Sequence, residues 1–103
     1  MTATEVELKN GALYLTRGIY DRYFAGIEAV ILLRRDCDLC ILPVCHAAAG
    51  GYMLKVRNKA GDRVAHAPDF FREHRVDDSI TMALPVVWST EQGALIAAEA
   101  FHL

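Results

Sequence analysis

The fold is decided by residues 12–44, ALYLTRGIYDRYFAGIEAVILLRRDCDLCILPV, and by residues 62–98, DRVAHAPDFFREHRVDDSITMALPVVWSTEQGALIAA. Each stretch predicts the same order of a strand, a short helix, a strand, a turn and a strand. An internal repeat constrains a fold more than a single motif does. We therefore divide the chain into two halves, at about residues 6–44 and 52–101, joined by a hinge at residues 45–51 (CHAAAGG).

Turn and cap residues mark the predicted elements of the first half. Asn10-Gly11 favours a tight turn between two extended segments, because both residues tolerate positive φ. Thr16 suits a helix N-cap, since its hydroxyl can accept from a free backbone N–H of the first turn. The apolar run of residues 28–33 is typical of a strand buried on both faces. A polar turn is expected at residues 34–38.

The three prolines give further boundaries. Pro43 ends its strand or places it at an edge, because it lacks the N–H that a ladder needs. Pro68 is suited to the first position of the second helix, which buries its phenylalanines. Pro85 predicts a bulge or an edge within the strand at residues 80–88. With a hairpin over residues 52–65, the chain is expected to be mainly β with two short helices (α+β by content).

Length and composition favour one small globular domain spanning residues 1–103. Hydrophobic residues make up 53% of the chain and charged residues 23%. No apolar run approaches the roughly 18 residues that cross a bilayer, and the N-terminus MTATEVELKN lacks the features of a secretory signal. Three cysteines, an odd number, fit a reducing environment. We therefore expect a cytoplasmic protein that does not contact a membrane.

Charge is unevenly distributed along the chain. The formal net charge is −2, whereas a nucleic-acid binder usually has a basic surplus. Residues 1–63 hold nine Lys or Arg and seven Asp or Glu, and residues 64–103 hold two basic and six acidic residues. A phosphate-binding surface is therefore expected in the first part.

One family pattern resembles residues 13–44. Leu13-x-Leu15-Thr16 before a short helix, then Phe24-x-Gly26-Ile27, an apolar strand, a turn and Leu39-x-Ile41-Leu42-Pro43 are similar to the AbrB-type swapped-hairpin domain. The resemblance implies two interlocked units forming a β-barrel, here both in one chain as in MraZ-like members. The first unit departs from the pattern at Thr16, where the family usually has proline.

The resemblance also implies a DNA-binding role for particular basic residues. Arg17 and Arg22 match the positions of family arginines that meet DNA, and arginine can bind phosphate or guanine bidentately. Lys55 and Arg57 share one face of the central hairpin by two-residue alternation. The alternative is an ordinary solvated face, with the cations paired to acids. Those acids include Glu7, Asp21 and Asp62.

A short stretch of cysteine and histidine is the sharpest local feature. Cys37, Cys40, Cys45 and His46 are thiolate and imidazole ligands of the kind that zinc prefers. Their spacing is short, and no second CxxC motif completes a site. The alternative is incidental cysteines that are buried or lie at a loop edge.

The sequence favours a binding module over an enzyme. No nucleophile motif, phosphate loop, HExxH or dinucleotide-binding glycine pattern is present. The first hypothesis is a DNA-binding transcriptional regulator of AbrB type, which oligomerises to gain avidity. The second is an accessory protein that binds a partner protein, a small ligand or a metal, without DNA.

Overall fold

The computed structural model describes residues 4–45 and 50–101. The predicted hinge at residues 45–51 lies largely outside these ranges, because residues 46–49 are not among them. In the described part the chain is mainly β with two short helices, as predicted. In chain order the elements are β1 (Glu5–Lys9), β2 (Ala12–Leu15), α1 (Arg17–Tyr23), β3 (Ala29–Arg35), β4 (Asp38–Val44), β5 (Tyr52–Met53), β6 (Lys55–Val56), β7 (Arg63–His66), α2 (Pro68–Glu73), β8 (Thr81–Ser89) and β9 (Ala94–Ala97).

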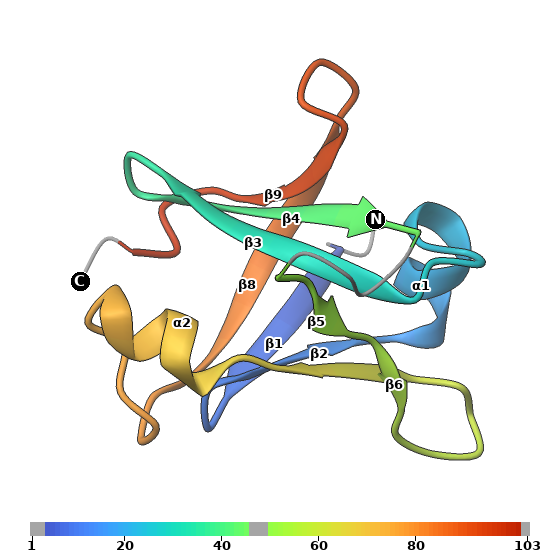
Figure 1. The fold of residues 1–103 in the computed structure, drawn as a ribbon, viewed down its shortest axis with the longest axis horizontal. Helices are drawn as coiled ribbons and strands as arrows, with labels where there is room; N and C mark the ends of the chain where they lie inside the picture. The colour runs from blue at the N-terminus through green and yellow to red at the C-terminus, as the bar shows by residue number, and fades with distance from the viewer. Residues whose placement is uncertain (1–3, 46–49, 102–103) are drawn as a thin grey trace.

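The strands form one antiparallel sheet that curls into a nearly closed barrel (Figure 1). The strand order is β5-β3-β4-β9-β8-β1-β2-β7-β6. Its two end strands, β5 and β6, are separated in the chain by Leu54 alone. Leu54 donates its N–H to Glu28 O at 2.8 Å, so one short segment reaches β3 on one side and β7 on the other. This segment brings the two edges of the sheet together.

Strand β8 makes the opposite corner of the barrel. Its first part pairs with β1 as far as Pro85, and from Val86 onward it pairs with β9. Pro85 faces Glu5, the first residue of β1. The proline therefore lies where the strand changes partners, which agrees with the edge position expected for a residue without an N–H.

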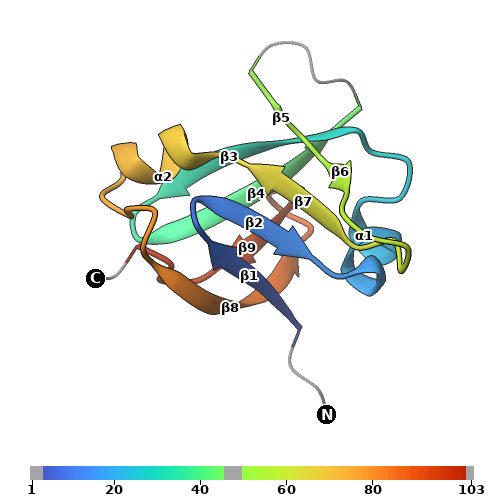
Figure 2. The same ribbon diagram turned by 90° about the horizontal axis from the view of Figure 1, so that it is seen from below.

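The same order of elements occurs twice along the described chain. Strands β1, β2, β3 and β4 with α1 correspond to β5–β6, β7, β8 and β9 with α2. The β3–β4 hairpin of the first half lies between β5 and β9, and the β8–β9 hairpin of the second half lies between β4 and β1. The strand order thus stays the same when the halves are exchanged. The helices lie at opposite ends of the barrel (Figures 1 and 2).

A pseudo-two-fold axis relates the halves and passes through two cross-strand pairs. On β2 and β7 it passes between Leu13 and Ala65, and on β4 and β9 between Cys40 and Ile96. Leu13 and Ala65 belong to the main core, whereas Cys40 and Ile96 belong to a separate, smaller cluster. Alternation along a strand sends neighbouring side chains to opposite faces, so the first pair points into the barrel and the second points out.

Large apolar side chains fill the barrel. Phe24 and Phe71 are at most 1% exposed, and they fill the interior at the two ends of the barrel where the helices lie. Many core residues occupy equivalent positions in the halves, such as Leu8 and Leu54 or Leu39 and Leu95. In the described chain no charged or polar side chain is buried.

The predicted caps and turns are confirmed, with one boundary corrected. Thr16 Oγ1 accepts from the Ile19 N–H at 3.3 Å, and Pro68 opens α2. The turn predicted at residues 34–38 is shorter, because β3 continues to Arg35 and only two residues turn. No helix in the described residues is long and apolar enough to cross a membrane.

The β1–β2 turn also packs against the second half. Gly11 has φ +74°, and a Cβ there would lie 2.7 Å from Pro68 Cα. Glycine is therefore required both by the turn geometry and by the close approach of α2. The Ala67 N–H donates to Gly11 O at 3.0 Å, which fixes the start of α2 on this turn.

Candidate functional site

One outer face of the barrel carries rows of polar side chains. We call the outer surface of β8, β1, β2, β7 and β6 the charged face. Strand register places one side chain from each strand in a single row across it: Ala83, Glu7, Tyr14, Val64 and Lys55. The face is centred on the axis between β2 and β7.

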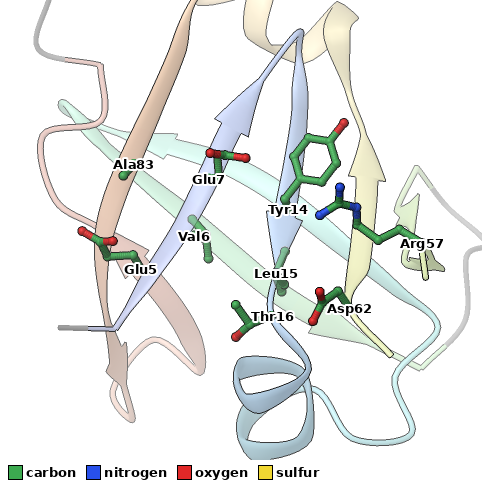
Figure 3. A pocket seen from close by; sticks show the side chains of 9 residues that line it. All are labelled: Glu5, Val6, Glu7, Tyr14, Leu15, Thr16, Arg57, Asp62 and Ala83. Atoms are coloured by element: carbon green, nitrogen blue, oxygen red, sulfur yellow. The ribbon is translucent and has the colours of Figure 1, made fainter. Parts of the chain in front are cut away.

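A hollow of about 270 Å³ lies on the charged face (Figure 3). Tyr14 stands beside Arg57, whose guanidinium carbon is 4.7 Å from the centre of the tyrosine ring. This cation–π contact holds the arginine over the sheet. The hollow is lined by Glu5, Val6, Glu7, Tyr14, Leu15, Thr16, Arg57, Asp62 and Ala83.

A second hollow, of about 510 Å³, adjoins the first in front of α1. It shares Glu5 and Thr16 with the first hollow and adds Arg22 and Tyr23 from the helix. The two hollows therefore lie next to each other on this side of the barrel.

Asp62 connects the central hairpin to the first helix. Its carboxylate accepts from the Arg17 backbone N–H at 2.9 Å and from Asn58 Nδ2 at 3.0 Å. The bond from Asn58, followed by that from Arg17, lowers the pKa of Asp62 below its ordinary value. Asp62 is therefore negatively charged at neutral pH.

The four predicted DNA-contacting residues belong to two segments, α1 and the part of the central hairpin at residues 55–57. Arg57 lines the first hollow and Arg22 the second. Arg17 begins α1, and its Nε lies 3.3 Å from Asp21 Oδ2. Lys55 ends the row that contains Glu7 and Tyr14. These are exposed side chains that a ligand can reach.

Carboxylates are the part of this face that sequence reasoning did not assign to a site. Glu5 and Glu7 line the first hollow together with Asp62. The sequence pattern could have predicted the positions of two of them, Glu5 and Glu7. Alternation of Glu5 and Glu7 with buried Val6 and Leu8 puts both acids on the outer surface of β1, and the tight Asn-Gly turn then sets Glu7 opposite Tyr14. The face therefore has mixed charge.

The predicted zinc ligands are spread along β4. Cys37 precedes the strand and Cys45 follows it, eight residues later, which in an extended strand spans about 26 Å. One ion therefore cannot bind both thiols. His46 lies outside the described residues. In residues 4–45 and 50–101 no three His, Cys, Asp or Glu side chains come together to hold a metal ion.

Cys40 has its own environment on the outside of the barrel. Its side chain is 2% exposed, and burial raises the pKa of the thiol. Its Sγ lies 3.7 Å from Gln92 Oε1, on the turn between β8 and β9. Cys40 thus remains a protonated thiol at neutral pH.

The geometry of the charged face is suited to binding extended, charged ligands. Guanidinium and ammonium groups attract phosphates or carboxylates, while Glu5, Glu7 and Asp62 attract cations. The side chains that line the first hollow come from β1, β2 and β8 and from the segments beside α1 and β6 (Figure 3). Comparison of the chain with family models, with curated proteins and with solved structures finds no match.

Proposed function

We propose that the chain is a swapped-hairpin module of the AbrB and MraZ kind that binds DNA as a small, non-enzymatic transcriptional regulator. Both units of the module are in one chain, and the first supplies the DNA-binding residues. The observation that carries the proposal is that Arg57 and Arg22 line two hollows that share Glu5 and Thr16, while Arg17 and Lys55 belong to the same two segments of the chain. The interlocked hairpins, which agree with the resemblance in residues 13–44, support it.

The cations differ in how firmly the protein holds them. Arg57 is held by the ring of Tyr14, which leaves its N–H groups free for phosphate. Arg17 packs its aliphatic chain over Gly61, where an added Cβ would lie 3.0 Å from its Cδ. Guanidinium groups that are already positioned lose less side-chain entropy when they bind. Arg57 and Arg17 are therefore the main phosphate ligands of the proposal.

A salt titration tests DNA binding directly. Fluorescence anisotropy with a labelled duplex of about 20 base pairs is measured between roughly 20 and 200 mM salt. Four neutralised phosphates give a log–log slope of about −3.6, since each contributes about −0.9. Arg57→Gln is expected to reduce the slope by about 1.

Arg72→Gln is the matched control, because Arg72 is an exposed arginine on α2, away from the charged face. It is expected to leave the slope unchanged. Absence of binding at 20 mM salt, or binding that does not depend on salt, would contradict the proposal.

A second candidate is favoured by the three carboxylates in the hollow. A partner protein that presents a segment of mixed charge would use Glu5, Glu7 and Asp62 as well as the cations. Glu7→Gln separates the two candidates. It strengthens DNA binding, because a negative charge near the phosphates is removed, and it weakens binding of a mixed-charge partner. Weaker or unchanged DNA affinity in Glu7→Gln would argue against DNA on this face.

A further inference from the structure

The turn between β6 and β7 is longer than its counterpart in the first half. Two residues, Asn10-Gly11, turn between β1 and β2. Between the equivalent strands β6 and β7 the turn is made by residues 57–62, which we call the arm. Two residues are enough to connect a hairpin of this kind. The extra length of the arm is therefore not needed to form the sheet.

Hydrogen bonds inside the arm hold its ends together. The Arg57 N–H donates to Asp62 O at 2.8 Å, and the Gly61 N–H donates to Asn58 O at 3.1 Å. The Asn58 side chain accepts from the Asp62 N–H at 3.1 Å and donates to the Asp62 carboxylate at 3.0 Å. The arm is therefore a closed loop with a defined shape.

The carboxylate of Asp62 joins the arm to the start of α1. Its Oδ1 accepts from the Arg17 N–H at 2.9 Å, and the side chain lies beside Thr16 (Figure 3). The first N–H groups of a helix have no partner within the helix, so Asp62 supplies an acceptor that α1 lacks. At the other helix, Gly11 O accepts from the Ala67 N–H. Each turn thus holds the start of the other half's helix, and the arm does so with a charged side chain.

The docked arm also contacts the two arginines that serve as the main phosphate ligands of the proposed function. Gly61 has φ +89°, and an added Cβ there would lie 3.0 Å from Arg17 Cδ, so the Arg17 side chain packs against the arm. Arg57 is the first residue of the arm. After the hydrogen bonds from Asn58 and Arg17, the positive charge of Arg57 also lowers the pKa of Asp62. Asp62 is therefore close to Arg57 and bonded to Arg17.

We propose that Asp62 is a positioning residue for DNA binding, because it docks the arm on α1 and so fixes Arg17 relative to Arg57 before phosphates bind. The inference rests on the proposed function and adds a carboxylate to the residues on which that function depends. Asp62 itself repels phosphates. Its removal therefore ends a repulsion, which strengthens binding, and frees the arm, which weakens binding by loss of preorganisation. In this proposal the second effect is the larger.

Two variants of equal charge separate positioning from repulsion. Asp62→Ala removes both acceptor oxygens, whereas Asp62→Asn keeps one for the Arg17 N–H. Binding is measured by anisotropy with the labelled duplex of the salt titration. Asp62→Ala is expected to weaken binding at least about fivefold and to reduce the salt slope by about 1, because Arg17 no longer holds a phosphate. Asp62→Asn is expected to bind at least about threefold more tightly than Asp62→Ala, because it keeps the hydrogen bond.

Glu7→Gln is the matched control for charge, because Glu7 lines the same hollow from β1. It also removes one negative charge and is expected to strengthen binding, which is the opposite sign to Asp62→Ala. In a chain that carries Arg17→Gln, Asp62→Ala is expected to lose most of its effect, since it acts through that arginine. Circular dichroism and urea unfolding confirm that the variants are folded under the assay conditions.

Amide hydrogen exchange without DNA tests the docking itself. Exchange of the Arg17 N–H is expected to be at least about tenfold faster in Asp62→Ala than in the wild-type chain, because its acceptor is gone. The Phe24 N–H, which donates to Tyr20 O at 2.8 Å at the other end of α1, is the internal control and should exchange at an unchanged rate.

Binding by Asp62→Ala as tight as that of the wild-type chain would overturn the inference, as would equal affinities of the alanine and asparagine variants. In both cases a wild-type chain with the expected salt slope leaves the proposed function in place. Exchange of the Arg17 N–H that Asp62→Ala does not accelerate would overturn the docking without any use of DNA. A wild-type chain that does not bind DNA at about 20 mM salt contradicts the proposed function itself.

Discussion

The charged face and the outer surface of β3, β4, β9 and β8 both lie on the pseudo-two-fold axis, yet they carry different kinds of outward side chains. Under both surfaces the two halves of the chain supply matching inward side chains. Leu39 matches Leu95, and Leu8 matches Leu54. Outward, Tyr14 corresponds to His66 near one end of the axis, while Leu33 corresponds to Val87 near the other. The barrel thus constrains only the residues that fill it.

The largest expected effect comes from breaking the equivalence inside the barrel. Leu39→Ala and Leu95→Ala each remove a side chain that is 0% exposed. Each is expected to lower the free energy of unfolding by about 2–5 kcal/mol, and the two losses should agree within about 1 kcal/mol. Urea unfolding followed by the fluorescence of Trp88 measures both. A loss below about 1 kcal/mol for either variant would contradict the matched core.

Leu33→Ala and Val87→Ala make the same kind of truncation at two equivalent positions whose side chains point out of the barrel. Each is expected to lower the free energy of unfolding by less than about 1 kcal/mol, because the exposed side chains lose little burial. A cost as large as that of the inward leucines would mean that the outer face is part of the folding core.

A smaller effect distinguishes the two helix starts. Thr16 caps α1 through its hydroxyl, whereas Ala67 at the start of α2 has no side-chain cap. Thr16→Ala is expected to lower the free energy of unfolding by about 1 kcal/mol, since it leaves the Ile19 N–H without its acceptor. Thr16→Ser keeps the oxygen and serves as the control. Equal stability of the alanine and serine variants would show that the cap contributes nothing.

The smallest effect is the response of two exposed carboxylates to acid. Hydrogen bonds lower the pKa of Asp62 on the charged face and of Asp77 before β8, where the Ser79 side chain and then its N–H donate. A pKa lowered by folding adds stability above the unfolded value of about 3.9, and this stability is lost as the pH falls through the folded pKa. NMR titration of both carboxyl groups is expected to show midpoints below 3.9.

The variants Asp62→Asn and Asp77→Asn test how much each carboxylate contributes to the dependence of stability on pH. Each is expected to flatten the dependence of stability on pH below about 4 while the other carboxylate still titrates. An Asp62 midpoint at or above 3.9 would contradict the hydrogen bonds that tie the hairpin to α1.

Local signals in the sequence were sufficient for turns and caps, but not for surfaces. Asn10-Gly11, Thr16 and Pro68 were assigned from their own chemistry, which acts over a few residues. The run at 28–33 was interpreted as buried on both faces, but Leu33 is 46% exposed on the outer side of β3. Burial on an outer face depends on distant segments, which periodicity does not reveal.

The candidate site shows the same limit. Its basic residues were found from alternation and resemblance, but Glu5 and Asp62 meet around one hollow only because β1, β2 and β7 pair across the halves. The zinc prediction rested on closeness in the sequence. Cys37 and Cys45 are close in sequence, and the extended strand between them separates them in space.

Pairing between strands that are distant in the sequence also determines when the protein can fold. Strand β1 pairs with β8, so Glu5 cannot pair until Pro85 has been synthesised. Strand β4 pairs with β9, which is also late in the sequence. Contacts this distant in sequence slow folding. During synthesis the first half therefore exposes unpaired strand edges until nearly the whole chain has left the ribosome, and in that interval it is most exposed to aggregation.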